Sequence, residues 1–289
     1  NIGIPLLSLH DKINDNTIVV AEFSANQLER CKFSPHIAVV LNLFEEHLDY
    51  FGRLEDYYKS KMNIFINQNK NDYVFFNKDN KTLVDIVKNY NFKQQVYWFS
   101  IGREENIKKQ VGFIVDNAMF YIDNNGILER IYEFNNSFNL FGKHNRLNAL
   151  CAALIGKIYG LSNELIKRGI NNFKSLPHRL EYVGEYNGVK YYNDSISTIP
   201  EATIEAVEAI NNVDILIIGG YDRGISYEKL IDYLKLNYSG EVIFFSEAGK
   251  RIYNMLITSN EHSDIKKISW HKNLRDATDY LLSIVNKGN

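Results

Sequence analysis

The chain has 289 residues, 45% of them hydrophobic and 24% charged, which suffices for a large buried core and for two domains. Its 33 Lys and Arg against 35 Asp and Glu give a net charge of −2, without any block of like charge typical of nucleic-acid-binding or membrane-binding arms. Two cysteines exclude a disulfide framework and no apolar run approaches about 18 residues, which predicts a cytoplasmic protein that binds neither nucleic acid nor membrane. The first residues, NIGIP, include no initiator Met and no signal-peptide core, which indicates a piece of a longer protein.

Short β-rich segments alternate with amphipathic segments through the first part of the chain. Nearly continuous β-branched runs predict buried strands, and apolar residues spaced by three or four predict helices. The predicted elements in chain order are strands at 17–23, 36–43 and 72–77 around a helix at 54–67, then antiparallel strands at 111–122 and 127–134, and helices at 144–159 and after Ser162. This pattern predicts an α/β domain with a mostly parallel sheet and a small antiparallel part.

A domain boundary is predicted near Leu176 and Pro177, so the two domains are expected at residues 1–176 and 177–289. After the boundary come a hairpin and then alternating helices and strands, which favour a parallel, doubly wound sheet. The predicted elements are hairpin strands at 181–186 and 189–193, helices at 202–210, 227–236, 248–257 and 274–285, and strands at 213–218 and 241–245.

Polar side chains follow two predicted strands of the first domain. Glu22 closes the strand at 17–23, and His47 and Asp49 follow the strand at 36–43. Because the carboxyl ends of parallel strands meet at one edge of a sheet, these groups are expected to converge there as metal ligands or phosphate-site groups. Taken singly, a solvated loop acid and a structural histidine are the more common alternatives.

Lys61 lies 14 positions after His47 on the apolar face of the predicted helix. One interpretation is a lysine whose stem lies along the core while its ammonium reaches water. The other is a desolvated lysine, whose neutral amine reacts with CO₂ to give a carbamate. A carbamate would supply the oxygen ligand that Mg²⁺ prefers.

Polar motifs also occur at predicted loops and helix starts in the later part of the chain. The helix beginning near Gly142 carries amides such as Asn148, which suit phosphate or adenine recognition, although Asn is also common as a helix cap. Arg179 at the domain junction offers bidentate phosphate contact or a surface salt bridge. A polar turn near Asp194 and a glycine turn at 219–224 each follow a predicted strand.

Together and in this order, eight stretches resemble the Mur ligase family. They begin at Asn1 (NIGIP), Glu22 (EFSANQLE), Asn42 (NLFEEHLDYFG), Tyr57 (YYKSK), Gly142 (GKHNRLNALCAA), Leu176 (LPHRLEYV), Asn193 (NDSISTIPEA) and Ile217 (IIGGYDRG). The resemblance implies a three-domain, ATP-dependent amide ligase. It further implies that residues 1–176 are part of the central ATPase domain and residues 177–289 part of a Rossmann-like C-terminal domain.

The resemblance also implies a role for each motif residue. Glu22 would bind a Mg²⁺ shared with the ATP phosphates, while His47 and a carbamylated Lys61 would bind a second Mg²⁺. Asn148 would contact adenine. The remaining implied positions come from the last domain: Arg179 and Asp194 on the nucleotide after domain closure, His178 near the domain interface, and Arg223 at an active-site position usually held by lysine.

The branch of the family that this chain resembles most adds glutamate to UDP-N-acetylmuramoyl-L-alanine in peptidoglycan synthesis, through an acyl phosphate, and a monomer is expected. Two departures stand out. Ile196 replaces the usual lysine of an NDSKATN motif, and no GxxxxGK[ST] occurs, so the P-loop is expected upstream of Asn1. The alternatives are an L-glutamate-adding variant, a folylpolyglutamate synthase-like ligase, and a non-catalytic, truncated binding module.

Overall fold

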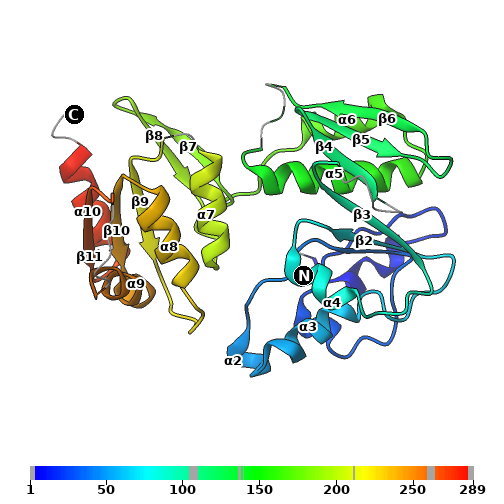
Figure 1. Cartoon of the computed structure of the whole chain (residues 1–289), viewed down its shortest axis with the longest axis horizontal. Coiled ribbons are helices and arrows are strands. Elements are labelled where there is room, and N and C mark those ends of the chain that lie inside the picture. Colours follow the sequence, from blue (N-terminus) through cyan, green and yellow to red (C-terminus); the bar gives the residue numbers. More distant parts are fainter. Residues whose placement is uncertain are drawn as a thin grey trace. The chain divides into compact units, whose positions relative to one another are not determined.

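A computed structural model of the chain describes residues 4–103, 110–135, 138, 140–210, 212–258 and 264–285. The start of the NIGIP motif, Asn1 to Gly3, lies outside the described residues. The chain divides into two compact units, one of Asn1–Phe113 with Ile122–Ile127 and one of Ile114–Tyr121 with Leu128–Asn289 (Figure 1). The expected boundary between residues 176 and 177 falls inside the second unit and stays a prediction.

Parallel strands form the core of the first unit. Strand β1 pairs in parallel with β2, and β2 pairs in parallel with β3, with Ile37 opposite Tyr73 and Tyr73 opposite Gln95. The elements up to residue 133 are a 3-10 helix η1 (Leu6–Lys12), α1 (Ala25–Leu28), β1 (Ile37–Val40), α2 (Leu48–Phe51), α3 (Leu54–Met62), β2 (Tyr73–Asn77), α4 (Lys81–Val87), β3 (Gln95–Ile101), β4 (Gln110–Val115), β5 (Ala118–Ile122) and β6 (Leu128–Glu133).

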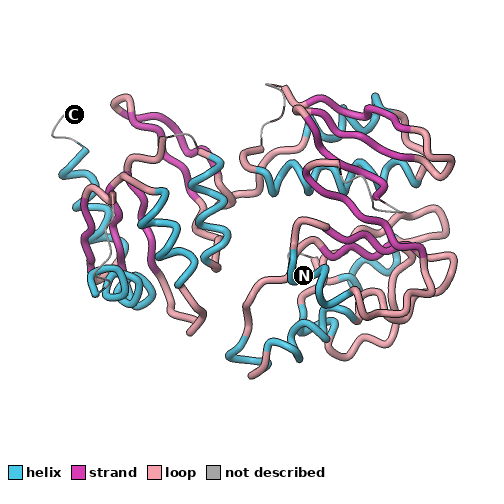
Figure 2. Tube along the Cα trace, viewed as in Figure 1, coloured by secondary structure: helices cyan, strands magenta, loops and turns pink. Residues whose placement is uncertain are grey.

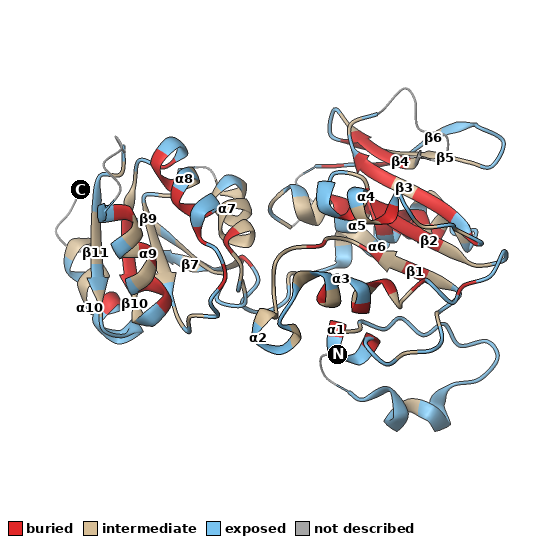
Figure 3. Ribbon diagram, turned by 60° about the horizontal axis from the view of Figure 1, so that its bottom comes forward, coloured by how far each residue is buried: buried red, intermediate tan, exposed pale blue. Residues whose placement is uncertain are grey.

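Strands β1 to β6 follow one another in a single six-stranded sheet, with β4 to β6 as its hairpin-connected part (Figure 2). Asp116 and Asn117 both take positive φ, 47° and 64°, in the two-residue turn between β4 and β5, as a tight antiparallel hairpin requires. The α/β class with a mostly parallel sheet and a small antiparallel part is confirmed. Helix α3 contributes Met62 to the core under β1 and β2, which also holds Phe65 and Phe76 (Figure 3).

The strand predicted at residues 17–23 is wrong, because this segment contains no regular structure and begins with exposed side chains. A strand needs a hydrogen-bonded neighbour, and in the described part of the sheet β1 is an edge strand with β2 as its partner. Val20 remains 93% exposed despite its β-branched side chain. Sequence propensity alone therefore did not make a strand here.

Helix α3 ends at Met62, five residues before the predicted end at 67. The amide of Asn63 donates to the carbonyls of Ser60 and Lys61, which tightens the last turn, and its side chain Nδ2 donates to the carbonyl of Leu28, 2.9 Å away. A side chain that bonds to backbone outside the helix favours a helix end. Asn63 thereby fixes the C-terminal end of the helix that carries Lys61.

The second unit contains β6, most of β5 and the remaining elements, most of which match the predicted ranges within a few residues, whereas strand β11 was not predicted. They are α5 (Lys143–Ile158), α6 (Asn163–Asn172), β7 (Glu181–Tyr186), β8 (Val189–Asn193), α7 (Pro200–Ala209), β9 (Ile215–Gly219), α8 (Glu228–Asn237), β10 (Glu241–Phe245), α9 (Ser246–Thr258), β11 (Lys267–His271) and α10 (Leu274–Val285). The predicted hairpin of β7 and β8 is confirmed as an antiparallel pair.

Strands β9, β10 and β11 form a parallel sheet in the order β11-β10-β9. Helices α8 and α9 bury Leu234 and Ile252 against Val242 and Phe244 of β10. Sequential parallel strands joined by helices are the expected αβ arrangement. All three strands end at one edge, at Gly219, Phe245 and His271.

Two glycines of this unit predict opposite effects of adding a methyl group. A Cβ on Gly219 would lie 2.1 Å from the carbonyl oxygen of Phe245, whereas a Cβ on Gly169 of helix α6 meets nothing within 4 Å. We expect Gly219→Ala to destabilise the protein by about 2 kcal/mol through overpacking and Gly169→Ala to stabilise it by up to about 1 kcal/mol through helix propensity. Urea unfolding measures the change in the free energy of unfolding for each variant. Equal changes in the two variants would contradict the packing at β9.

Both cysteines are free thiols, and they differ in burial. Burial raises the pKa of the Cys151 thiol to about 12, while Cys31 is only half-buried. Because the thiolate is the reactive form, we expect Cys31 to react with a disulfide reagent at pH 8 and Cys151 to stay silent until the protein unfolds. The absorbance of the chromophore that the reagent releases, measured before and after adding urea, counts the reactive thiols. Rapid reaction of both cysteines in the folded protein would contradict the prediction.

Candidate active site

A cluster around the buried Tyr57 brings two of the predicted site residues together. The His47 ring lies 5.7 Å from the Tyr57 ring between centroids, and the Lys61 Nζ lies 4.9 Å from the same ring. Tyr57 is 1% exposed and sits on α3 one turn before Lys61. His47 therefore contacts helix α3, which carries Lys61, through the Tyr57 ring.

The backbone of His47 has the left-handed conformation, with φ 58° and ψ 28°, immediately before α2. A non-glycine residue in this region carries a conformational cost that the surrounding structure must offset. The side chain that results faces Glu46, with 3.7 Å between the His47 Nε2 and a Glu46 carboxylate oxygen. Glu46 thus joins the cluster, although the sequence motif did not single it out.

Burial lowers the pKa of the Lys61 amine, and the Glu46 carboxylate opposes this effect by favouring the ammonium. The net direction is downward, so desolvation is the dominant cause. A lower pKa raises the share of neutral amine, the form that reacts with CO₂. The carbamate on Lys61 stays a prediction.

Glu22 lies in the segment without regular structure and is exposed. Among the described residues, no three His, Cys, Asp or Glu side chains come close enough to hold a metal ion. A metal at the Tyr57 cluster would therefore have Glu46 and His47 beside it. It would also need oxygen ligands from a carbamate on Lys61. The role of Glu22 as a metal ligand stays a prediction.

Helix α5 of the second unit presents Asn148 on its exposed face. The helix begins after Gly142, whose φ of 88° favours glycine and where a Cβ would require the His144 side chain to shift. Arg146 is held by the Asn117 side chain at 2.7 Å and by the face of the Phe134 ring, 4.6 Å from its centroid. Asn148 thus lies on an anchored first part of the helix and is itself available to a ligand.

The loop carrying His178 and Arg179 is tied to the turn after β8 in the same unit. Asn193 Nδ2 donates to His178 Nδ1 at 2.9 Å, the Leu180 amide donates to Asp194 Oδ1 at 2.8 Å, and the Ile196 amide donates to the His178 carbonyl. The Asp194 carboxylate also accepts from the Ser197 hydroxyl at 2.6 Å. Two motifs that are separate in sequence therefore form one hydrogen-bonded structure.

This structure leaves Arg179 exposed and fixes its backbone. His178 and Leu180 on either side have positive φ, 64° and 45°. Such strain in two nearby residues requires compensating bonds, and Asp194 and Asn193 supply them. The loop is therefore shaped to present the guanidinium outward, as recognition of an anion requires.

The glycine turn after β9 carries Arg223 on the surface. Its neighbour Asp222 accepts from Arg251 of α9, with Nη2 2.9 Å from Oδ1, and the Arg251 guanidinium lies 4.3 Å from the centroid of the Tyr227 ring. Arg251 also donates to the Ile225 carbonyl. The turn that presents Arg223 is consequently clamped at both ends, a feature that the sequence analysis did not predict.

Residues 1–156 match the model described as the Mur ligase middle domain. The chain belongs to the Mur ligase family. Two curated relatives named UDP-N-acetylmuramoylalanine--D-glutamate ligase are 39% identical over 81% of this chain (Koribacter versatilis, 50% of its length) and 32% identical over 100% of this chain (Ligilactobacillus salivarius, 60% of its length). The chain thus spans about half to three fifths of the length of these Mur ligases.

Solved structures share the fold of this chain. MurF from Acinetobacter baumannii superposes with a TM-score of 0.64 at 16% identity, over 88% of this chain and 54% of that one. The E. coli FolC structure with DHPP and ADP gives a TM-score of 0.58 at 15% identity, over 86% of this chain and 55% of that one. No helix among the described residues is both long and apolar enough to cross a bilayer.

Proposed function

We propose that this Mur ligase chain is the catalytic central and C-terminal part of an ATP-dependent ligase that joins glutamate to UDP-N-acetylmuramoyl-L-alanine. Two curated relatives with that activity in their names support the proposal. The observation that carries it is the Tyr57 cluster, where a desolvated Lys61 and His47 both contact the Tyr57 ring and Glu46 lies beside His47. The finer assignments, namely Mg²⁺ at two sites, a carbamate on Lys61, a monomer and a cytoplasmic location, belong to the same proposal.

The chemistry begins with an unreactive carboxylate. The L-alanyl carboxylate attacks the γ-phosphorus of ATP, ADP leaves, and an acyl phosphate forms. The glutamate amine then attacks the acyl carbon, and inorganic phosphate leaves as the amide bond forms. In the first step two anions approach each other, so catalysis depends on positive charge and positioning.

The residues of this chain supply these two requirements. Bound Mg²⁺ would supply electrostatic stabilisation of the phosphates, with Glu46, His47 and a carbamylated Lys61 as the groups present to hold it. Arg179 and Arg223 are exposed cations on fixed loops, suited to the phosphates and to a carboxylate respectively. Asn148 offers an amide to the adenine ring, and Asp194 and His178 keep the Arg179 loop in shape.

The test is a phosphate-release assay on the protein expressed from its complete coding sequence, with ATP, Mg²⁺ and UDP-N-acetylmuramoyl-L-alanine. We expect release that requires glutamate and a product heavier by one glutamyl residue in mass spectrometry. Parallel reactions with D-glutamate and L-glutamate decide the stereoisomer, which Ile196 leaves open because it replaces the usual lysine. Absence of release with both isomers would overturn the proposal.

A further inference from the structure

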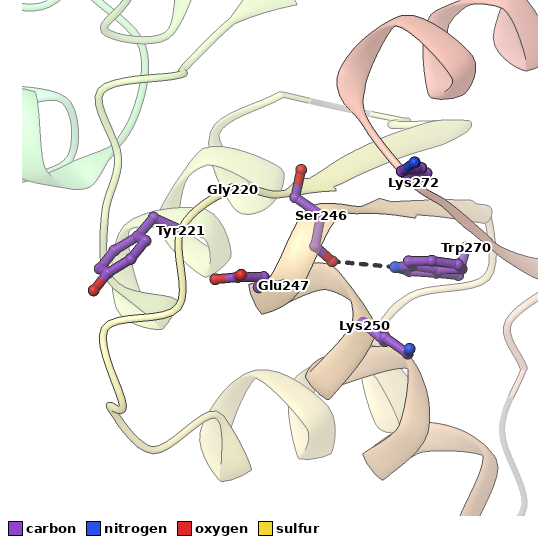
Figure 4. A pocket seen from close by; sticks show the side chains of 7 residues that line it. All are labelled: Gly220, Tyr221, Ser246, Glu247, Lys250, Trp270 and Lys272. Atoms are coloured by element: carbon purple, nitrogen blue, oxygen red, sulfur yellow. Dashed lines mark hydrogen bonds between the residues drawn. The ribbon is translucent and has the colours of Figure 1, made fainter.

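The second unit contains a pocket that none of the predicted site residues lines. It has a volume of about 590 Å³ and opens where β9, β10 and β11 end (Figure 4). Gly220 and Tyr221 follow β9, and Trp270 and Lys272 lie at the end of β11. Open parallel sheets bind ligands outside the carboxyl ends of their strands, and this volume lies in the range of small-molecule sites.

One wall of the pocket holds two cations. The Lys250 Nζ lies 5.1 Å from the centroid of the Trp270 ring, and Lys272 follows β11 two residues after Trp270. The indole Nε1 of Trp270 donates to the Ser246 carbonyl at 3.1 Å, which fixes the ring under Lys250. Neither lysine is ion-paired with a carboxylate in the part of the chain that the structure describes. Two positive charges therefore line the pocket together with the Glu247 carboxylate.

The opposite wall is aromatic. Tyr221 is 79% exposed, although its ring is large and mostly apolar. Figure 4 shows the side chains in the order Tyr221, Glu247, then Trp270 with the two lysines across the pocket. An exposed ring on a turn clamped through Asp222 and Arg251 is a ready stacking surface.

We propose that this pocket binds a nucleoside phosphate. The base would stack on Tyr221, the ribose hydroxyls would donate to the Glu247 carboxylate, and the phosphate would pair with Lys250 and Lys272. The order of ring, carboxylate and cations across the pocket matches the order of base, sugar and phosphate in the ligand. A free inorganic anion would use the lysines alone and would leave Tyr221 and Glu247 without a function.

Asn148, Arg179 and Asp194 do not line the pocket, and Arg223 lies on the same turn as Tyr221 without lining it. The test therefore measures binding rather than ligase activity. Titration calorimetry of the 289-residue chain with adenosine 5′-monophosphate, without Mg²⁺, tests the proposal. We expect saturable binding that becomes about tenfold weaker in each of Lys250→Met, Lys272→Met and Tyr221→Ala. The matched control is Lys167→Met, which removes an exposed lysine from α6 of the same unit and should bind as the parent does.

Four outcomes decide the matter. Binding that survives Asn148→Ala but falls in the pocket variants supports the site, and thermal melts show whether each variant remains folded. Absence of saturable binding up to about 5 mM overturns the proposal. Equal affinity in the lysine variants and the parent overturns it as well. Ribose 5-phosphate binding as tightly as the nucleotide overturns the nucleoside assignment, because the ring would then contribute nothing.

Discussion

Lys61→Ala is expected to lower the turnover of the complete protein by about a thousandfold or more. Removing one preorganised electrostatic group from a phosphoryl-transfer site costs that order of rate, and Lys61 is the group through which the Tyr57 cluster would gain oxygen ligands. Steady-state phosphate release with both substrates measures the loss. Because the lost group is proposed to be a carbamate, acetate or formate should restore part of the activity to the alanine variant.

Lys59→Ala is the matched control for this experiment. Lys59 lies on the same helix, α3, two residues earlier, but it is exposed, whereas burial lowers the pKa of Lys61. We expect its turnover to stay within about twofold of the parent, since an exposed helix lysine contributes little. Near-parental turnover of Lys61→Ala without added acetate or formate would contradict the carbamate.

Asp194→Ala is expected to lower activity by about a hundredfold and to lower the free energy of unfolding by about 1–3 kcal/mol. The carboxylate accepts from the Leu180 amide and the Ser197 hydroxyl, so alanine releases the loop that presents Arg179. A small displacement of a positioning group costs about this much rate. Steady-state kinetics with varied ATP and urea unfolding measure the two losses.

Asp194→Asn separates geometry from charge. The amide oxygen still accepts a hydrogen bond from the Leu180 amide, so the free energy of unfolding should be close to that of the parent protein. If the negative charge acts on the nucleotide, as the family resemblance implies, activity stays low in this variant. Asp232→Ala on the exposed face of α8 serves as the control and should change neither quantity. Full activity of Asp194→Ala would contradict the proposed role of the loop.

Local pattern predicted most of the second unit and less of the first. The hairpin of β7 and β8, helices α7 to α10 and strands β9 and β10 carry turn and periodicity signals and formed as expected, whereas strand β11 was not predicted. Helix α4 and strand β3 were not predicted, although Leu83, Ile86, Val87 and Tyr90 have helical spacing and residues 96–101 form a nearly continuous apolar run. Residues 17–23 were predicted as a strand from their β-branched side chains, but a strand also needs a neighbour.

The candidate site shows the same division. His47 and Lys61 were chosen from motif spacing, and the structure brings both to the ring of Tyr57. Glu46 and Arg251 were not predicted. A carboxylate beside a histidine and an arginine within a helix are too common to stand out, and only their partners, His47 and Asp222, give them meaning.

The sequence by itself determined the family, the α/β class and the residues that carry the proposed chemistry, because motif order and apolar periodicity are local properties of the chain. The tertiary structure decided what those residues experience. Desolvation of Lys61 depends on the core packed around α3, and the presentation of Arg179 depends on hydrogen bonds between segments about 15 residues apart. Burial and non-local bonds arise only when distant segments meet, so no local pattern encodes them.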